Sequence, residues 1–217
     1  MSKVAVILSG CGVFDGAEIH EATATLLALD KAGADVTICA PAITQMHVVD
    51  HQSGNPVDNQ SRDVLIESAR IARGPIADIA DLNASDFDAV ILPGGFGAAK
   101  NLCTFAVDGA ECTINLDVAD FLLAARASNK VIGAMCIAPA LVAKLFGNDI
   151  KVTIGNDPGT VAAINATGAI HVEATVNEVV VDESAKIVTT PAYMLAQNIS
   201  EVFSGIQNFV DKVLELA

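Results

Sequence analysis

Cys136 lies at a junction of the sequence that could make its thiol reactive. The apolar run 131–135 before it is typical of a strand buried on both faces of a sheet. Pro139 follows, and the apolar residues within 141–146 recur at helical spacing. We therefore expect Cys136 in a strand-to-helix turn at the carboxyl edge of the sheet, where a helix N-terminus favours the thiolate. The alternative is a buried, inert cysteine.

Glu21 is the candidate proton-transfer partner of Cys136. It lies near the start of a predicted helix, one turn beyond Glu18. A carboxylic acid in a dry pocket has a raised pKa, so it can share a proton with a thiolate and carry protons during a reaction. Glu18 has the spacing of a capping residue after Asp15. Spacing alone fits a solvated Glu21 equally well and does not show which glutamate faces the thiol.

Backbone donors for a developing oxyanion are predicted in two loops. Gly94 and Gly95 permit a close approach of the backbone, and their N–H groups could join that of Ile137, next to Cys136. The glycine pair is equally compatible with a simple tight turn. It is not a phosphate-binding P-loop, because no Gly-Lys-Ser/Thr sequence follows it.

A second thiol and four histidines complete the candidate groups. Cys11 is predicted to line the same pocket and is the fallback nucleophile. His20 is a further pocket candidate, but it neighbours Glu21, and consecutive helical residues point about 100° apart, so at most one of them faces Cys136. The other histidines are expected at the surface or at a strand edge: His47, His51 and His171.

The elements that must position these residues alternate along the chain. Residues 3–40 have the pattern of a β-α-β unit, which predicts a parallel sheet. We expect one α/β domain, 1–217, with a doubly wound, mostly parallel sheet sandwiched by helices. Strands are predicted at 4–9, 36–40, 88–92, 131–135, 152–154, 172–181 and 186–190, a hairpin at 48–57, and helices at 15–33, 63–73, 115–127, 139–146, 161–166 and 196–216.

Composition excludes several classes of partner. Hydrophobic residues make up 52% of the 217 residues, and the formal charge of −14 argues against nucleic acids and anionic membranes. No signal peptide or membrane-spanning run is recognised. The five cysteines lack CxxC spacing, so we expect neither a disulfide framework nor a zinc site. A reducing, cytoplasmic location is the resulting expectation.

Five stretches spread along the whole chain resemble a known family. They resemble the PfpI-like branch of the class I glutamine amidotransferase-like superfamily and, within it, the ElbB-like proteins linked to isoprenoid biosynthesis. The stretches are VILSGCGVFDGAEIHEA at 6–22, VLIESARIARGPI at 64–76, VILPGGFGAAKNL at 90–102, MCIAPA at 135–140 and KIVTTPAYMLAQNI at 186–199.

The resemblance implies a fold, a site and an activity. It implies a flavodoxin-like fold, Cys136 as nucleophile, Glu21 as its acid partner, and the Gly94–Gly95 loop as part of the oxyanion site. For the ElbB-like proteins it implies a homodimeric glyoxalase that needs no cofactor or metal. Such an enzyme converts a small dicarbonyl, glyoxal, to glycolate through a Cys136 hemithioacetal.

Two other functions stay open at this point. Cys136 could act as a redox or electrophile sensor, or the protein could bind a partner in isoprenoid metabolism without chemistry. Many family members carry a histidine after the strand that follows the nucleophile helix, and the segment 153–157 contains none. The segment 190–193, where amidotransferases place their histidine, also lacks one, which argues against glutaminase activity.

Overall fold

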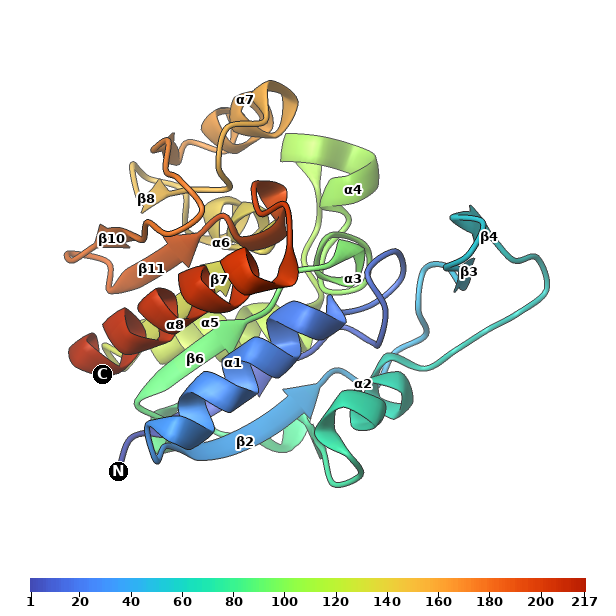
Figure 1. The fold of residues 1–217 in the computed structure, drawn as a ribbon, viewed down its shortest axis with the longest axis horizontal. Coiled ribbons are helices and arrows are strands. Elements are labelled where there is room, and N and C mark those ends of the chain that lie inside the picture. Colours follow the sequence, from blue (N-terminus) through green and yellow to red (C-terminus); the bar gives the residue numbers. More distant parts are fainter.

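A seven-stranded sheet forms the centre of the computed structural model, which describes residues 1–217 (Figure 1). The strand order is β10-β11-β7-β6-β1-β2-β5, and only β10 runs antiparallel to its neighbour. This arrangement confirms the predicted α/β fold with a mostly parallel sheet. The strands are β1 (Lys3–Ile7), β2 (Asp35–Ala40), β5 (Ala77–Asp78), β6 (Ala89–Leu92), β7 (Val131–Met135), β10 (Val180–Asp182) and β11 (Ile187–Thr190).

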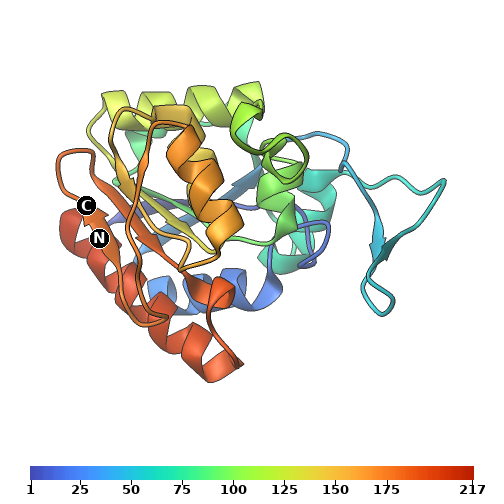
Figure 2. The same ribbon diagram turned by 90° about the horizontal axis from the view of Figure 1, so that it is seen from above.

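Helices cover both faces of this sheet, as Figure 2 shows. Helices α1 (Ile19–Lys31), α2 (Val64–Ala72) and α8 (Ile199–Leu216) lie on one face, and α5 (Leu116–Ala127) and α6 (Pro139–Phe146) lie on the other. In strand β1, successive side chains point to opposite faces of the sheet. Val4 and Val6 belong to the core beneath α1 and α8, whereas Ala5 and Ile7 belong to the core beneath α5 and α6. A strand buried on both faces needs apolar residues at every position, which explains its unbroken run.

Short elements surround the carboxyl edge of the sheet and its flanks. The helices among them are α3 (Phe96–Lys100), α4 (Phe105–Asp108) and α7 (Pro158–Ala166), with 3-10 turns η1 (Ile79–Asp81), η2 (Ala84–Asp86), η3 (Gly109–Glu111) and η4 (Ala192–Met194). Strands β8 (Lys151–Val152) and β9 (Ile170–His171) form a small parallel pair of their own. None of the helices combines the length and apolar character that crossing a membrane requires.

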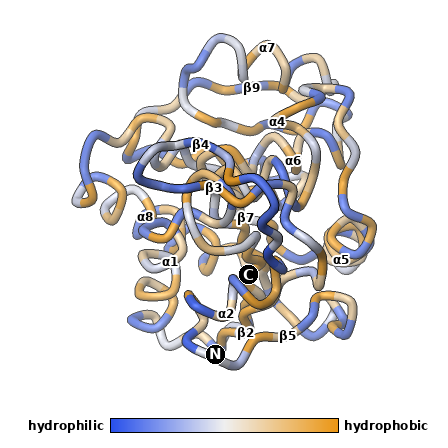
Figure 3. The backbone as a smooth tube through the Cα atoms, turned by 90° about the vertical axis from the view of Figure 1, so that its right-hand side faces the viewer, coloured by the Kyte–Doolittle hydropathy of each residue, from blue (hydrophilic) through white to orange (hydrophobic).

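A hairpin of β3 (Val49–Asp50) and β4 (Asn55–Pro56) projects away from the body of the molecule (Figures 1 and 2). Hydrophilic residues follow one another along it in Figure 3, whereas the strands of the sheet are mostly hydrophobic. Its base is fixed by a buried side chain, because Asp15 Oδ2 accepts the N–H of Val49 at 2.7 Å. This contact corrects the predicted capping box, in which Asp15 was expected to begin the first helix.

The predicted strand at 172–181 is the other correction. Only its end, in β10, pairs with β11, and the sheet ends there. The preceding residues form a turn, in which Thr175 N–H donates to Glu178 Oε2 at 2.7 Å and Glu178 N–H donates to the Thr175 carbonyl at 3.0 Å. The alternating apolar pattern does not reveal this turn, because a side-chain contact closes it.

Candidate active site

Cys136 occupies the predicted turn between β7 and α6. Its φ of +60° places it in the left-handed region, which a residue with a side chain adopts at a cost of roughly 1–3 kcal/mol. Its neighbours hold it there, because its N–H donates to the Thr190 carbonyl at 3.0 Å and Ala138 N–H donates to the Met135 carbonyl at 3.0 Å. The side chain is 8% exposed. The turn therefore presents the sulfur at the carboxyl edge of the central strands, below the surface.

Glu21 is the glutamate that meets this thiol. It is fully buried, and its carboxyl group lies close to the Cys136 sulfur, because a Cβ placed on Gly94 would lie 2.7 Å from Glu21 Oε2 and 2.9 Å from Cys136 Sγ. Two backbone groups hold the carboxyl, because Oε2 accepts the N–H of Gly94 at 3.0 Å and Oε1 accepts the N–H of Tyr193 at 3.1 Å. Glu18 is instead the N-cap of α1, where its Oε2 accepts the N–H of Glu21 at 2.7 Å. Spacing alone did not show which glutamate faces the thiol, and the structure places Glu21, not Glu18, beside it.

Burial dominates the protonation of this pair. Burial and, second to it, the charge of the nearby Glu18 raise the pKa of the Glu21 carboxyl to about 8. Burial also raises the pKa of the Cys136 thiol, as does the charge of Glu21, whereas the N–H groups of Gly95 and Ile137 lower it. The expectation that Cys136 is held as a thiolate at the helix N-terminus therefore needs correction. The two groups titrate together, and at neutral pH the pair does not hold two negative charges.

The backbone donors near the sulfur come from both predicted loops. The N–H groups of Gly95 and Ile137 are hydrogen-bonded to the Cys136 sulfur. The N–H of Gly94 is already bound to Glu21, so its part is to hold the carboxyl. A Cβ at Gly94 would lie 2.4 Å from Cys136 Cβ and 2.7 Å from Glu21 Oε2, so only glycine lets the loop pass between the two side chains.

A cavity of about 250 Å³ opens above the sulfur. It is mostly apolar and offers a few polar groups, which suits a small ligand. Beside Cys136, Gly95, Glu18 and Ile137, its lining residues are Val13, Phe96, Thr160, Tyr193 and Met194. Sequence reasoning missed these five as site residues. Tyr193 could have been found, because it follows β11, the parallel neighbour of β7, at the same edge of the sheet.

The two further pocket candidates lie outside this cavity. His20 is exposed, and its Nδ1 lies 2.7 Å from the hydroxyl of Tyr193. It contacts Tyr193, which lines the cavity, but does not line the cavity itself. Cys11 does not line the cavity, and its charged neighbours are Glu67 and Arg70 on α2. The structure therefore does not bring Cys11 and Cys136 together.

The remaining histidines do not supply a base to the sulfur. His51 Nε2 accepts the N–H of Phe14 at 3.2 Å, and His171 Nε2 accepts the N–H of Ile154 at 3.3 Å; neither lines the cavity. Gly155 lies in the segment after β8 where a family histidine was sought. A Cβ there would lie 2.8 Å from Leu195 Cγ, so a larger side chain would displace Leu195. No group of three or more His, Cys, Asp or Glu side chains is arranged to hold a metal ion.

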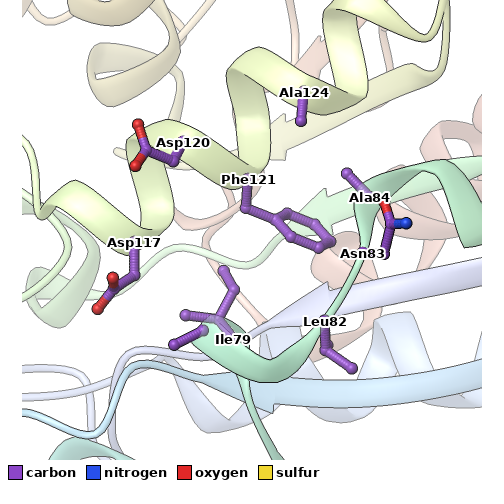
Figure 4. A pocket seen from close by; sticks show the side chains of 9 residues that line it. Ile79, Leu82, Asn83, Ala84, Asp117, Asp120, Phe121 and Ala124 are labelled. Atoms are coloured by element: carbon purple, nitrogen blue, oxygen red, sulfur yellow. The ribbon is translucent and has the colours of Figure 1, made fainter.

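A second cavity, of about 310 Å³, lies between η1, η2 and α5 (Figure 4). Phe121 points toward the loop that carries Ile79, while Asp117 and Asp120 lie at the rim of the cavity. It shares no lining residue with the cavity above Cys136. Of the two, only the cavity above Cys136 has a thiol and a buried glutamate, Glu18, in its lining.

Known proteins resemble this chain in sequence and in fold. A mitochondrial ES1 protein homolog from Rattus norvegicus is 49% identical over 99% of the chain and 84% of its own length. The human mitochondrial glutamine amidotransferase-like class 1 domain-containing protein 3 is 50% identical over 99% and 83%. An isoprenoid biosynthesis protein with an amidotransferase-like domain from Ehrlichia chaffeensis is 35% identical, with a TM-score of 0.93 over 100% of this chain and 99% of that one. A glyoxalase III from Candida albicans shares the fold, with a TM-score of 0.65 at 16% identity over 99% and 97%.

These relatives correct one expectation and establish the family. The expected cytoplasmic location is wrong by this comparison, because both curated relatives are mitochondrial proteins. Reduced thiols and an acidic composition do not distinguish one reducing compartment from another. The model of the DJ-1/PfpI family matches residues 3–198, nearly the whole chain. On this match and on the identities above, the chain belongs to the DJ-1/PfpI family.

Proposed function

We propose that the protein is a glyoxalase that converts small 2-oxoaldehydes to 2-hydroxy acids, glyoxal to glycolate, without a cofactor. The observation that carries the proposal is the buried contact between Cys136 and Glu21 beneath a small, mostly apolar cavity. A carboxyl group whose pKa is about 8 can both give and take a proton near neutral pH. That property is what moving a hydrogen between two adjacent carbons requires.

The first step forms a bond between the sulfur of Cys136 and the aldehyde carbon of the substrate. In the molecules whose Glu21 is ionised, the thiol proton leaves to this carboxylate, and the carbonyl oxygen of the substrate becomes an oxyanion. The N–H groups of Gly95 and Ile137, which already favour negative charge on the neighbouring sulfur, are the donors that stabilise this oxyanion. Return of the proton from Glu21 to the oxygen gives a neutral hemithioacetal.

The second step moves a proton between the two carbons of the bound substrate. Glu21 takes the proton from the carbon attached to sulfur, and the neighbouring carbonyl becomes an enediolate. The hydroxyl proton of the first carbon passes to the neighbouring oxygen. Glu21 then returns its proton to the neighbouring carbon as the first oxygen becomes the carbonyl of the thioester. The product is a thioester of a 2-hydroxy acid. Water then adds to the thioester carbon, the C–S bond breaks, and Cys136 recovers its proton as glycolate leaves.

Hydrolysis of the thioester is the step that the site supports least. A positioned base typically contributes a factor of about 10² to 10⁴, and no histidine lines the cavity. We therefore expect slow turnover, limited by hydrolysis. A thioester should accumulate on Cys136 and be visible by mass spectrometry of rapidly quenched samples.

Glycolate formation from glyoxal tests the proposal directly. Cys136→Ala removes the nucleophile and should abolish the reaction, whereas Glu21→Gln cannot accept a proton and should slow it by about 10² or more. Cys39→Ala is the matched control, because this buried thiol lies on β2, outside the cavity. Full activity of Cys136→Ala would refute the proposal.

A second candidate is an ElbB-like binding protein linked to isoprenoid biosynthesis. The similarity to the Ehrlichia chaffeensis protein over the whole chain favours it. In that case the cavity binds a small metabolite and Cys136 performs no chemistry. Complementation of a deletion strain separates the two, because only a binding protein would retain its cellular phenotype with Cys136→Ala.

A further inference from the structure

Two cysteines that the proposed reaction does not use lie side by side at the edge of the larger core. Cys103 follows α3, and Cys112 follows η3. The backbone brings their segments together, because Thr104 N–H donates to the Thr113 carbonyl and Asn115 N–H donates to the Leu102 carbonyl, both at 2.9 Å. The two thiols lie close enough to shift each other's pKa, the Cys103 thiol donates to the Ala98 carbonyl at 3.3 Å, and both residues are buried, at 3% and 2% exposed.

We propose that Cys103 and Cys112 are a redox pair that a hydroperoxide converts to a reversible intramolecular disulfide. The Cys112 thiolate attacks one oxygen of hydrogen peroxide and becomes a sulfenic acid, while the other oxygen leaves as hydroxide and is protonated to water. The Cys103 sulfur then attacks the sulfenic sulfur, and a second water leaves. Two thiols and one peroxide thus give one disulfide and two waters.

The surroundings assign different roles to the two sulfurs. The neighbouring Cys103 thiol lowers the pKa of the Cys112 thiol to about 7, and the positive charge of Lys144 assists. Lys144 is held in place, because its Nζ donates to the Ala110 carbonyl at 2.7 Å. The neighbouring Cys112 thiol and burial raise the pKa of Cys103, which therefore keeps its proton. Cys112 is the attacking thiolate, and Cys103 is the resolving thiol.

Peroxide can reach Cys112 more readily than a cysteine in the sheet. The residues on both sides of it, Glu111 and Thr113, are exposed, so Cys112 belongs to a segment at the surface of the protein. Cys39 provides the contrast: burial raises the pKa of its thiol to about 12, and it has no thiol partner. We therefore expect oxidation to select the pair over Cys39.

Closing the disulfide would act on the candidate site. The segment between the two cysteines carries α4, whose Phe105 and Ala106 line a cavity of about 270 Å³. Phe96, Ile137 and Thr160 line this cavity and also the one above Cys136, so the two cavities adjoin. An S–S bond of about 2.05 Å is shorter than any contact between two thiols, so its formation must pull together the two ends of the segment that carries α4. Access to Cys136 should change as a result.

Peptide mapping under non-reducing conditions tests the pair in the intact protein. After brief treatment with hydrogen peroxide, we expect a peptide that joins Cys103 to Cys112, with a loss of two hydrogen atoms in mass, and its disappearance on treatment with dithiothreitol. The Cys136→Ala protein should give the same crosslink, which separates this proposal from the glyoxalase reaction. If both cysteines remain alkylatable while other thiols oxidise, the proposal is wrong.

Single variants test the roles of the two sulfurs and the link to the cavity. Cys103→Ala should accumulate a Cys112 sulfenic acid that dimedone traps, whereas Cys112→Ala should leave Cys103 unmodified; the reverse pattern contradicts the assignment. In the wild-type protein, the disulfide should change the rate of Cys136 alkylation by a bulky maleimide several-fold. An unchanged rate with the disulfide complete would overturn the link to the site.

Discussion

Glu21 determines how the chemistry of the site depends on pH. Its carboxyl group is buried without a cation nearby, and its partners are two backbone N–H groups and a thiol. A carboxyl in such surroundings costs less to bury when it is neutral. The protein therefore retains at this position an acid that is protonated where ordinary glutamates are ionised.

The stability of the protein should report this raised pKa. The folded-state pKa is about 8 and the ordinary value is 4.5, so between these values the folded state binds more protons than the unfolded state. Stability must then fall as pH rises across this window, by roughly 1 kcal/mol per pH unit. Glu21→Gln removes this contribution. Urea unfolding of both proteins at pH 5, 6, 7 and 8 should show the variant gaining on the wild type, and parallel curves would contradict the raised pKa.

For single residues, the sequence predicts which turn or helix carries a side chain better than it predicts which groups surround that side chain. The strand-to-helix turn at Cys136 could be placed because an apolar run meets a proline-started helix. The choice of Glu21 over Glu18, and the role of Gly94 as a donor to Glu21, could not be derived. Both depend on how α1 is rotated against the loop after β6, and side-chain spacing within one element does not contain that information.

Strand β7 connects the site to the core through a glycine. A Cβ on Gly133 would lie 2.6 Å from Phe209 Cζ and 3.0 Å from Val213 Cγ2, both on α8. Helix α8 therefore packs directly onto the backbone of β7. This close approach fixes the height of β7, and hence of the Cys136 turn that follows it.

Two glycine substitutions should have opposite effects on stability. Gly133→Ala forces α8 away from the sheet, and we expect a loss of about 1–3 kcal/mol. Gly159→Ala, in the first turn of α7, meets only Asp157 Oδ1 at 3.6 Å and should add up to about 1 kcal/mol, because alanine has the higher helix propensity. Chemical denaturation measures both. Equal stability of Gly133→Ala and the wild type would show that α8 does not hold the strand.

The elements that could be predicted are those in which burial determines the pattern of apolar residues. Strands β1 (after Lys3), β6 and β7 are apolar because helices cover both faces, and helices α1 and α8 show an apolar stripe. The short helices α3 and α4 were not predicted, because they lie in loops and are held by tertiary contacts. One such contact is the Asn101 side-chain amide, which donates to the Ser9 and Asp15 carbonyls at 2.9 Å each.

The whole molecule is organised around one sheet that uses strands from both ends of the chain. Strand β1 lies next to β6, β6 lies next to β7, and β7 lies next to β11. The first and last strands of the chain are therefore connected through the two central strands. Helix α8 then returns to pack on α1. We propose from this that residues 1–217 fold as one unit and, as the resemblance implies, that two such units form a homodimer.

Thermal unfolding should test both parts of that proposal. A single unit gives one transition, and a dimer whose folded state is held by its partner gives a midpoint that rises with protein concentration. Light scattering should give about twice the 22.3 kDa of one chain. Two separate transitions would contradict the single unit, and a mass of one chain would contradict the dimer.

The projecting β3–β4 hairpin offers a place where the chain can be lengthened. Its tip, 52–54, is fully exposed, and the contact that anchors the hairpin lies below it, between Asp15 and Val49. Exposed loop tips accept insertions because no packed backbone has to move. A reporter peptide spliced between Gln52 and Ser53 would therefore be displayed outside the body of the protein, with the sheet and the thiol turn left as they are.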